Sequence, residues 1–336
     1  MTNIQEVARA AGVSTATVSR FLAGQTIRSG EAVRRAIDDL GYSPSAVARS
    51  LKSGRHLCIG VVVPDITNPF FAALVKGIEG EARANGLQVI LGNSDEDAAQ
   101  EEALLADLAQ RTDGIIMAPL SEHERLPVRM NAAGVPLVFV DRDISSGVDL
   151  DRVMVDNASG VHQAVDHLAG LGHTRIGVIS GPLRSTPGRD RHQAFLDAMA
   201  VHRLEVDDEL VEVRDFRESG GHDAMVRLWA ADPKPTAVFV ANNLMTMGAL
   251  KALRELGVAI PGTISVVGFD DLPLAALLDP PLTVVDRPEF DQGAKAGRLL
   301  IERLQGDRTS TPQRVVLPVQ LVVRGSTAPP RSKGPQ

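Results

Sequence analysis

Beyond Cys58, short runs rich in Val and Ile alternate with longer stretches of helical periodicity. The strand candidates are Ile59–Val63, Gln88–Leu91, Gly114–Met117, Leu137–Val140, Ile176–Ile179, Ala237–Val240, Ile264–Val267 and Thr283–Val285. The helix candidates are Phe70–Asn85, Ala98–Arg111, Ala158–Leu171, Asp190–Val201, Gly220–Ala230, Met245–Leu256 and Glu289–Leu304. Such apolar runs between helices are typical of buried parallel strands. The alternation predicts doubly wound α/β layers, and its length predicts two such domains.

Ligands of doubly wound folds bind beyond the carboxyl ends of the strands. Polar or aromatic side chains that suit a ligand stand in six stretches of this chain, most of them after a strand candidate: Asp65, Asn68, Phe70 and Phe71, then Asp141 and Arg142, then Arg191, then Phe216, then Asn242, then Asp270. Carboxylates, amides and guanidinium groups suit a hydroxyl-rich ligand, and aromatic rings suit its apolar faces. Each residue alone could be a helix cap or a core ring, but the whole set predicts a small-molecule pocket.

Charge is distributed unevenly along the chain. The formal net charge is −7, yet residues 1–57 carry eight basic side chains and four acidic ones. A basic N-terminal segment on an acidic body predicts that the segment binds a polyanion.

The N-terminal segment has the pattern of two helices joined by a tight turn. Ile4–Ala11 places apolar residues on one face, and Gly12 suits the left-handed conformation that ends such a helix. Ser14 can cap a second helix, Thr15–Leu22, and a third helix is expected over Glu31–Leu40. This order predicts an all-α helix-turn-helix domain, whose second helix enters the major groove of DNA.

The free face of that second helix carries Thr15, Ala16, Ser19 and Arg20. Arg20 can donate two hydrogen bonds to guanine O6 and N7, while Thr15 and Ala16 can contact a thymine methyl group. These side chains are therefore predicted to read base edges.

The residue types in this N-terminal region identify a protein family more specifically than the helix spacing does. The stretches NIQEVARAAGVSTATVSRFLAG and AIDDLGYSPSAVARSLKSGR closely resemble the DNA-binding head and hinge of the lactose-repressor (LacI/GalR) family, with a hinge especially similar to that of the purine repressor. The resemblance implies that Leu51 wedges into the minor groove, and that the short hinge segment is helical only when held there. It also places Arg49 and Lys52 near phosphate or the groove edge. The segment Gln25–Gly30 is shorter than the family pattern, so no phosphate contact is assigned to it.

Residues 58 to about 327 resemble the family's effector-binding core, which is related to the periplasmic galactose- and ribose-binding proteins. The resemblance implies a pocket wall of Phe70 and Phe71, with Phe216 stacked on the effector. It implies hydrogen bonds to the effector from Asp141, Arg142, Arg191, Asn242 and Asp270.

Two positions depart from the family pattern. Asn243 stands where the family usually has Asp, and Arg287 stands where it usually has Gln. One carboxylate fewer and one guanidinium more would make the mouth of the cleft more positive. We therefore expect an acidic effector, such as a sugar acid or sugar phosphate, with Arg287 among its ligands. Alternatively, both residues lie at the rim or behind the pocket.

These features predict four parts of the chain. They are a helix-turn-helix domain at 1–42, a hinge helix and linker at 43–57, a two-lobed periplasmic-binding-protein-like core at 58–327 and a disordered tail at 328–336. Lobe 1 is expected at about 58–156 and 287–316, and lobe 2 at about 157–285 and 317–327. The three crossings between them would act as a hinge. The tail has no leucine heptads, so we expect a homodimer that reads a near-palindromic operator on double-stranded DNA.

The leading interpretation is a DNA-binding transcription regulator, usually a repressor in this family, that is controlled by a small-molecule effector. A sugar-binding protein without a DNA role is the alternative. An enzyme is a third class, but the chain has no G-x-G-x-x-G, G-x-x-x-x-G-K-[ST] or G-x-S-x-G motif. Its histidines, among them His173, lack metal-ligand spacing, and most of them are expected at the surface. We thus expect no catalytic residue, no cofactor and no metal.

The expected compartment is the cytoplasm. The N-terminus has no apolar signal segment, no apolar run is long enough for a membrane span, and Cys58 is the only cysteine. No membrane partner is expected.

Overall fold

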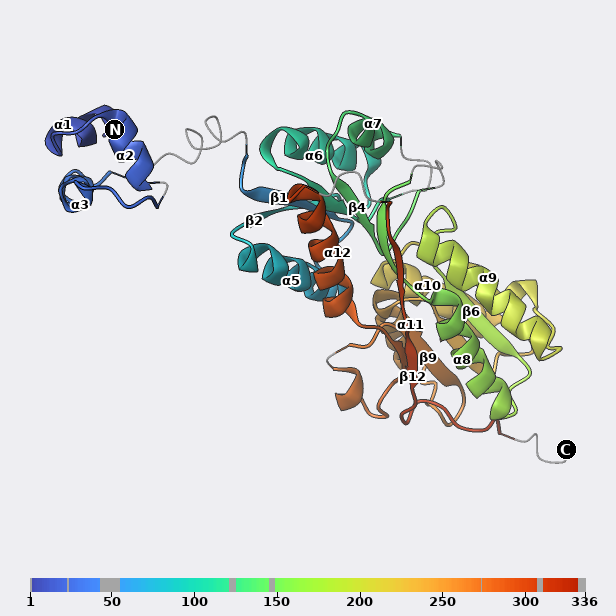
Figure 1. Ribbon diagram of the computed structural model, residues 1–336. Helices are drawn as coiled ribbons and strands as arrows, with labels where there is room; N and C mark the ends of the chain where they lie inside the picture. The colour runs from blue at the N-terminus through green and yellow to red at the C-terminus, as the bar shows by residue number, and fades with distance from the viewer. Residues whose placement is uncertain are drawn as a thin grey trace, which may run out of the picture. The chain divides into compact units, whose positions relative to one another are not determined.

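The computed structural model describes residues 2–22, 24–42, 55–120, 125–144, 149–272, 274–306 and 311–331. The chain divides into two compact units, Met1–Leu57 and Cys58–Gln336, called the head and the body below (Figure 1). Among the described residues, no helix is both long and apolar enough to span a membrane.

The head consists of three short helices around one apolar core. Helices α1 (Ile4–Ala10), α2 (Thr15–Leu22) and α3 (Gly30–Asp39) pack around Val7, Val18 and Val33, all fully buried. Gly12 adopts a positive φ of 64° in the turn between α1 and α2, as the prediction of a tight turn requires. The predicted helix-turn-helix order is therefore present.

Lobe 1 of the body is a parallel sheet with helices on both faces. Its strands are β1 (Cys58–Val63), β2 (Gln88–Asn93), β3 (Ile115–Met117), β4 (Leu137–Val140), β5 (Asp151–Val155) and β11 (Arg314–Leu317), in the order β11-β5-β4-β3-β1-β2. Its helices are α5 (Pro69–Ala84), α6 (Ala98–Arg111), α7 (Leu126–Ala132) and α12 (Glu289–Leu304). Helices α5 and α12 share one apolar cluster with the sheet, and α6 and α7 share another.

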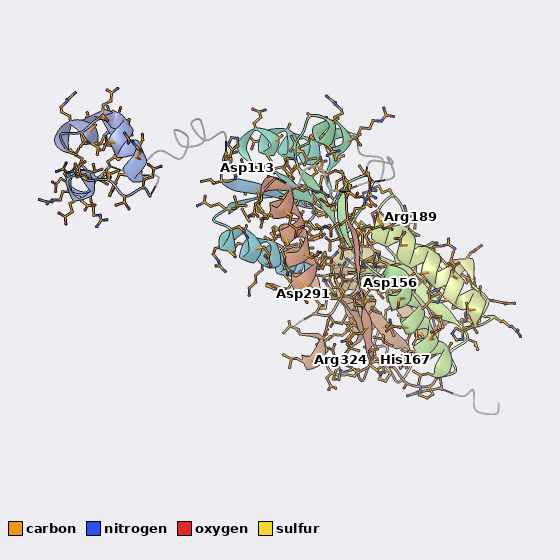
Figure 2. The ribbon with its side chains drawn as sticks, viewed as in Figure 1. Asp113, Asp156, His167, Arg189, Asp291 and Arg324 are labelled. Atoms are coloured by element: carbon orange, nitrogen blue, oxygen red, sulfur yellow. The ribbon has the colours of Figure 1, made fainter. Side chains whose placement is uncertain are left out.

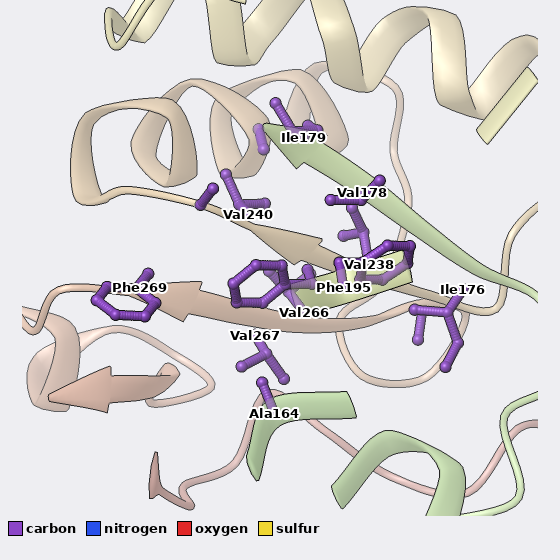
Figure 3. Close-up of a cluster of buried hydrophobic side chains, with 14 of the residues drawn as sticks. Ala164, Ile176, Val178, Ile179, Phe195, Val238, Val240, Val266, Val267 and Phe269 are labelled. Atoms are coloured by element: carbon purple, nitrogen blue, oxygen red, sulfur yellow. The ribbon is translucent and has the colours of Figure 1, made fainter. Parts of the chain in front are cut away.

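Lobe 2 repeats this architecture. Its strands are β6 (Ile176–Ser180), β7 (Val211–Val213), β8 (Ala237–Val240), β9 (Ser265–Phe269), β10 (Thr283–Asp286) and β12 (Gln320–Val322), in the order β12-β10-β9-β8-β6-β7. All neighbours are parallel except β12, which runs antiparallel to β10. Its helices are α8 (Asn157–Gly170), α9 (Thr186–Val201), α10 (Glu218–Ala230) and α11 (Asn243–Glu255), with short 3-10 turns at Asp208–Leu210 and Ala275–Leu277. One apolar cluster, which includes Phe195, Val238 and Phe269, fills the lobe (Figure 3).

The chain passes between the two sheets three times, after β5, after β10 and after β11. Figure 2 labels Asp156 at the first passage, where its side chain caps α8 by accepting a hydrogen bond from the amide of Ser159. The second passage carries Arg287, which lies between β10 and α12.

Glycines fix the start of α12 against α5. A Cβ atom at Gly77 would lie 2.1 Å from the carbonyl oxygen of Phe290, and one at Gly293 would lie 2.0 Å from that of Leu74. No side chain fits in so little space, so the two helix backbones touch. This packing holds the passage after β10 close to the first turn of α5, which carries Phe70.

The predicted fold class, an all-α head with a two-lobed α/β core, is confirmed. Four strands and helix α7 are absent from the sequence prediction. Strands β11 and β12 are edge strands without a fully buried residue, and β7 has three residues. Strand β5 begins with Asp151 and Arg152, which interrupt the apolar run. Continuous apolarity therefore identifies the edge strand β2 and every inner strand except β5, but not strands that are short, partly exposed or interrupted by charged residues.

The predicted disordered tail, residues 328–336, is wrong at its start, and the residues just before it are held in the same way. The hydroxyl of Ser326 donates to the carbonyl of Val266 and accepts from the amide of Thr283, and its residue is 1% exposed. The carbonyl of Ala328 accepts a hydrogen bond from Nε2 of His173, which is also buried rather than at the surface. A Pro-, Gly- and Ser-rich composition predicts disorder only where no distant segment offers partners. Residues 332–336 lie outside the described residues.

Candidate functional site

One cleft collects residues from both lobes at the carboxyl ends of the strands. It is lined by Asp65, Asn68, Phe70, Phe71, Glu96, Asp141, Arg142, Pro187, Arg191, Phe216, Arg217, Asn242, Asp270 and Arg287. The structure thus brings all the predicted effector-binding residues into one place. Three lining residues were missed: Glu96, Pro187 and Arg217. The rule of reading strand ends would have found Glu96, since it lies three residues after β2.

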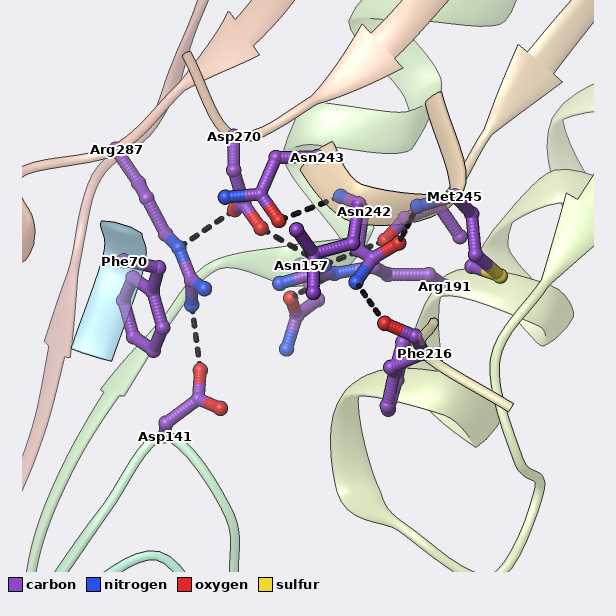
Figure 4. Close-up of polar contacts among 12 residues, drawn as sticks. Phe70, Asp141, Asn157, Arg191, Phe216, Asn242, Asn243, Met245, Asp270 and Arg287 are labelled. Carbon is purple, nitrogen blue, oxygen red and sulfur yellow. Dashed lines mark hydrogen bonds and ion pairs between the residues drawn. The ribbon is translucent and has the colours of Figure 1, made fainter. Parts of the chain in front are cut away.

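Arg287 lies at the centre of the cleft and joins the two lobes. Its Nη1 donates to Oδ1 of Asp141 at 2.5 Å, and its Nε lies 2.7 Å from Oδ1 of Asp270, close but poorly aligned for a hydrogen bond (Figure 4). Its guanidinium carbon lies 3.4 Å from the centre of the Phe70 ring. Burial alone would lower the pKa of Arg287, but the carboxylates of Asp270 and Asp141 outweigh it and raise that pKa.

Both carboxylates of this arrangement sit on unusual backbone. Asp141 follows β4 with φ of 64°, and Asp270 follows β9 with φ of 71°. Asp adopts this left-handed conformation more readily than most residues, but it still costs about 1 kcal/mol or more. Unfavourable backbone conformations are thus present at the ends of β4 and β9, where they direct the two carboxylates into the cleft.

Arg191 lies deeper, on α9, and keeps one donor without a partner. Its Nε donates to Oδ1 of Asn157 at 2.8 Å, and its Nη1 donates to the carbonyl of Ala241 at 2.7 Å. Its guanidinium lies 3.6 Å from the centre of the Phe269 ring. Among the described residues, its Nη2 has no hydrogen-bond partner. Burial, only partly offset by Asp270, lowers the pKa of Arg191 to about 10, so it stays charged at neutral pH.

Arg142 forms a second ion pair inside lobe 1. Its two terminal nitrogens donate to the two carboxylate oxygens of Glu96, at 2.6 and 3.2 Å. Burial alone would lower the pKa of Arg142, but Glu96 raises it. Its guanidinium lies 5.4 Å from the ring centre of Phe216, which comes from lobe 2. The cation is therefore matched by a carboxylate and faces an aromatic ring across the cleft.

Two of the predicted ligands also cap helices. Asn68 accepts from the amide of Phe70 at the start of α5, and Asn242 accepts from the amide of Met245 at the start of α11. Asn68 further accepts a hydrogen bond of 2.9 Å from Nδ2 of Asn243 in the other lobe. The caps aim these amides toward the cleft, so the structural and the binding interpretations are compatible for both.

The two lobes are closed on each other. Besides the Asn68–Asn243 bond, the hydroxyl of Thr186 in lobe 2 accepts from the amide of Asp143 in lobe 1 at 2.9 Å. Arg217 in lobe 2 donates to the carbonyl of Asp95 in lobe 1. The space left in the cleft is about 30 Å³, room for about one or two water molecules.

The charge that was expected at the mouth of the cleft is not free. Arg287 is buried, at 4% exposure, and forms ion pairs with two carboxylates. The side-chain amide of Asn243 donates a hydrogen bond to Asn68. In this closed form Arg287 is therefore an ion-paired group, and the expectation of an acidic effector stays a prediction. Within the described residues, no three His, Cys, Asp or Glu side chains gather as a metal site requires.

In the head, the predicted base-reading residues share one face of α2. Thr15, Ala16 and Arg20 are exposed and Ser19 is half-buried, while Val18 on the opposite face is fully buried. Ser14 caps the helix by accepting from the amide of Thr17 at 3.2 Å. The predicted DNA contacts at Arg49, Leu51 and Lys52 lie outside the described residues.

Comparison with known proteins covers nearly the whole chain. Residues 3–45 match the model of bacterial regulatory proteins of the lacI family, and residues 165–327 match that of a periplasmic binding protein-like domain. The ribose operon repressor of Escherichia coli K12 is 36% identical over 97% of this chain and 100% of its own length. The chain belongs to the lacI family. Its members are regulators, so the prediction of a DNA-binding transcription regulator is confirmed over that of a sugar-binding protein without a DNA role.

Two solved structures of lacI-family regulators share the whole architecture. A complex of the transcriptional regulator CelR with cellobiose is 35% identical, with a TM-score of 0.75, and covers 97% of this chain and 100% of its own. The lac repressor dimer bound to operator and the anti-inducer ONPF is 28% identical, with a TM-score of 0.85. It covers 97% of this chain and 99% of its own.

Proposed function

We propose that this lacI-family regulator is a repressor that binds a near-palindromic operator as a homodimer and responds to a sugar or related metabolite in the cleft. The observation that carries the proposal is the convergence of carboxylates, amides, guanidinium groups and aromatic rings from both lobes on one cleft. The similarity to the ribose operon repressor and to the CelR–cellobiose complex supports a carbohydrate effector. Such a protein acts on DNA in the cytoplasm and needs no catalytic residue or cofactor.

In this proposal the effector acts by changing how the lobes close. The cleft residues come from both lobes, so an effector that prefers one degree of closure shifts the equilibrium between closed and open forms. The predicted hinge residues Arg49, Leu51 and Lys52 precede β1, the first strand of lobe 1, in the sequence. Operator affinity and effector affinity are then linked, and the coupling is reciprocal.

A second copy of the chain has exposed apolar side chains available on lobe 2. Leu274 precedes the 3-10 turn Ala275–Leu277 and is 63% exposed, and Leu277 is its last residue and is 78% exposed. The lac repressor is described as a dimer on its operator, which supports a two-fold arrangement here.

The test selects operator sequences from a random DNA library with the full chain and then measures affinity by fluorescence anisotropy. We expect a near-palindrome with a guanine in each half-site. Arg20→Ala should cost about 1–3 kcal/mol per half-site and relax the preference for that guanine. Arg83→Ala, an exposed change on α5, should leave the preference unaltered. Recovery of no preferred sequence, or an unchanged preference in Arg20→Ala, would contradict the proposed role of α2.

A further inference from the structure

The guanidinium group of Arg287 lies between an aromatic ring and two carboxylates in the cleft. It lies against Phe70 at 3.4 Å, and it faces Asp141 of lobe 1 and Asp270 of lobe 2. An aromatic face and two opposed carboxylates are the contacts by which a polar ring with an apolar face is held. With Arg287 in place, about 30 Å³ remain, far too little for a sugar.

Arg287 also supplies the charge that closes the lobes. Asp141 and Asp270 come from facing strand ends and would repel each other without a cation between them. Arg287 comes from the passage between β10 and α12, and its side chain bridges the two carboxylates. The closed form thus has a residue of the chain itself as a bridge between the two lobes.

The same geometry bears on the class of effector. The innermost cations, Arg191 and Arg287, are matched in number by Asp141 and Asp270, and Arg142 is matched by Glu96. An anion at the Phe70 face would displace the cation that separates two carboxylates and add a third negative charge. A neutral polyol can instead donate hydroxyl hydrogens to both carboxylates, and Nη2 of Arg191 remains available to one of its oxygens.

We infer that Arg287 is a built-in occupant of the effector site, which holds the ligand-free lobes closed and selects an uncharged polyol ring that replaces its guanidinium group. This inference rests on the proposed function, since it assigns a ligand class to the same cleft. Because the competent form is only a fraction of the ligand-free protein, the apparent affinity for the effector is reduced by that fraction.

The experiment compares the full chain with Arg287→Gln, which removes the cation and the flat guanidinium face. Arg287→Lys keeps the charge but not the flat face, and it serves as the second variant if the first does not fold. Arg298→Gln is the matched control, because Arg298 is an exposed arginine of lobe 1 that pairs with Glu81 at the surface. Spin labels on cysteines introduced by Asp107→Cys on α6 and Asp223→Cys on α10, in a Cys58→Ser background, report the distance between the lobes.

Without ligand, we expect a single short distance for the parent chain and for Arg298→Gln, and a longer, broader distribution for Arg287→Gln. In calorimetry with D-ribose, D-glucose, cellobiose and D-gluconate, at least one neutral sugar should bind Arg287→Gln about tenfold or more tightly than it binds the parent chain. D-gluconate should show no such gain.

Two results would overturn the inference. One is a closed distance retained by Arg287→Gln without ligand. The other is a loss of affinity in Arg287→Gln for whichever compound binds the parent chain, above all D-gluconate, since Arg287 would then be a direct ligand contact. If none of the four compounds binds any variant, the carbohydrate part of the proposed function fails, and the label distance alone decides whether Arg287 holds the lobes closed.

Discussion

Lobe 2 has buried polar groups at both ends of its sheet, and the two sets are built differently. At the cleft end, Asp270 follows β9 on strained backbone and faces Arg191 and Arg287. At the other end lies a neutral group, called the far-end cluster here: His173, Thr236, Ser265, Ser326 and Ala328. Ser265 is the first residue of the same strand β9.

The two ends also differ in how well their hydrogen bonds are satisfied. In the far-end cluster, His173 uses both ring nitrogens, and the backbone groups of Ala328 pair with the Ser265 hydroxyl. At the cleft, Nη2 of Arg191 and Oδ1 of Asp270 have no hydrogen-bond partner among the described residues. A fully satisfied neutral network fixes structure, whereas incompletely satisfied charges can exchange partners with a ligand. The end proposed to bind the effector is thus the end whose hydrogen bonds are incompletely satisfied.

The largest effect on stability should come from the far-end cluster. His173→Ala removes a buried ring and leaves Thr236 and Ala328 short of partners, which should cost about 2–4 kcal/mol of unfolding free energy. Urea denaturation measures this cost. Effector and operator affinities should remain unaltered in the folded variant, and a loss of less than about 1 kcal/mol would remove the distinction between the two ends.

The opposite pattern is expected at the cleft. Asp270→Asn removes one charge beside Arg287, but the lobes can then open and expose the remaining groups to water. Loss of a solvent-exposed ion pair costs little, so the unfolding free energy should fall by about 1 kcal/mol or less. Affinity for the neutral sugar that binds most tightly should fall by about 10- to 100-fold, the worth of a hydrogen bond to a charged group. Calorimetry and urea denaturation on the same protein separate the two effects. A large loss of stability with unchanged affinity would mean that Asp270 is structural.

A smaller effect is expected at the start of the C-terminal segment. Ser326→Ala leaves the amide of Thr283 and the carbonyl of Val266 without the hydroxyl that bridges them, at a cost of about 1–2 kcal/mol. Ser219→Ala, a change at an exposed serine of α10, provides a matched control with no expected change in urea denaturation. Equal stability of both variants would restore the prediction of a loosely held tail.

The smallest effect is a dependence on pH. Burial lowers the pKa of His173, and its contact with the Ala328 carbonyl offsets this only partly. The unfolded chain then binds more protons once the pH falls below about 6.5, so this residue weakens the fold from there down to the lowered pKa. Comparison of urea midpoints at pH 7.5 and 5.5 should show a larger loss for the parent chain than for His173→Gln. An equal loss in both proteins would assign the pH dependence to other groups.

Much of this protein was readable from the order of its residues. Val- and Ile-rich runs located every inner strand except β5, because a strand buried on both faces needs apolar side chains throughout. The rule that ligands meet strand ends then singled out the cleft residues, from Asp65 to Asp270. Gly12 and Ser14 located the turn before α2 and the cap of that helix from local conformational preferences alone.

Only the tertiary structure decided how those residues are paired. Nothing near Arg287 in the sequence indicates an ion-pair partner. Its partner Asp141 lies 146 residues away. His173 and the C-terminal segment are polar and unremarkable until a bond across 155 residues joins them. Local preference acts over a few residues, whereas the state of a charge depends on every group that folding brings within a few ångströms of it. The sequence therefore determined which groups meet at the cleft, and the fold determined that one of them already fills it.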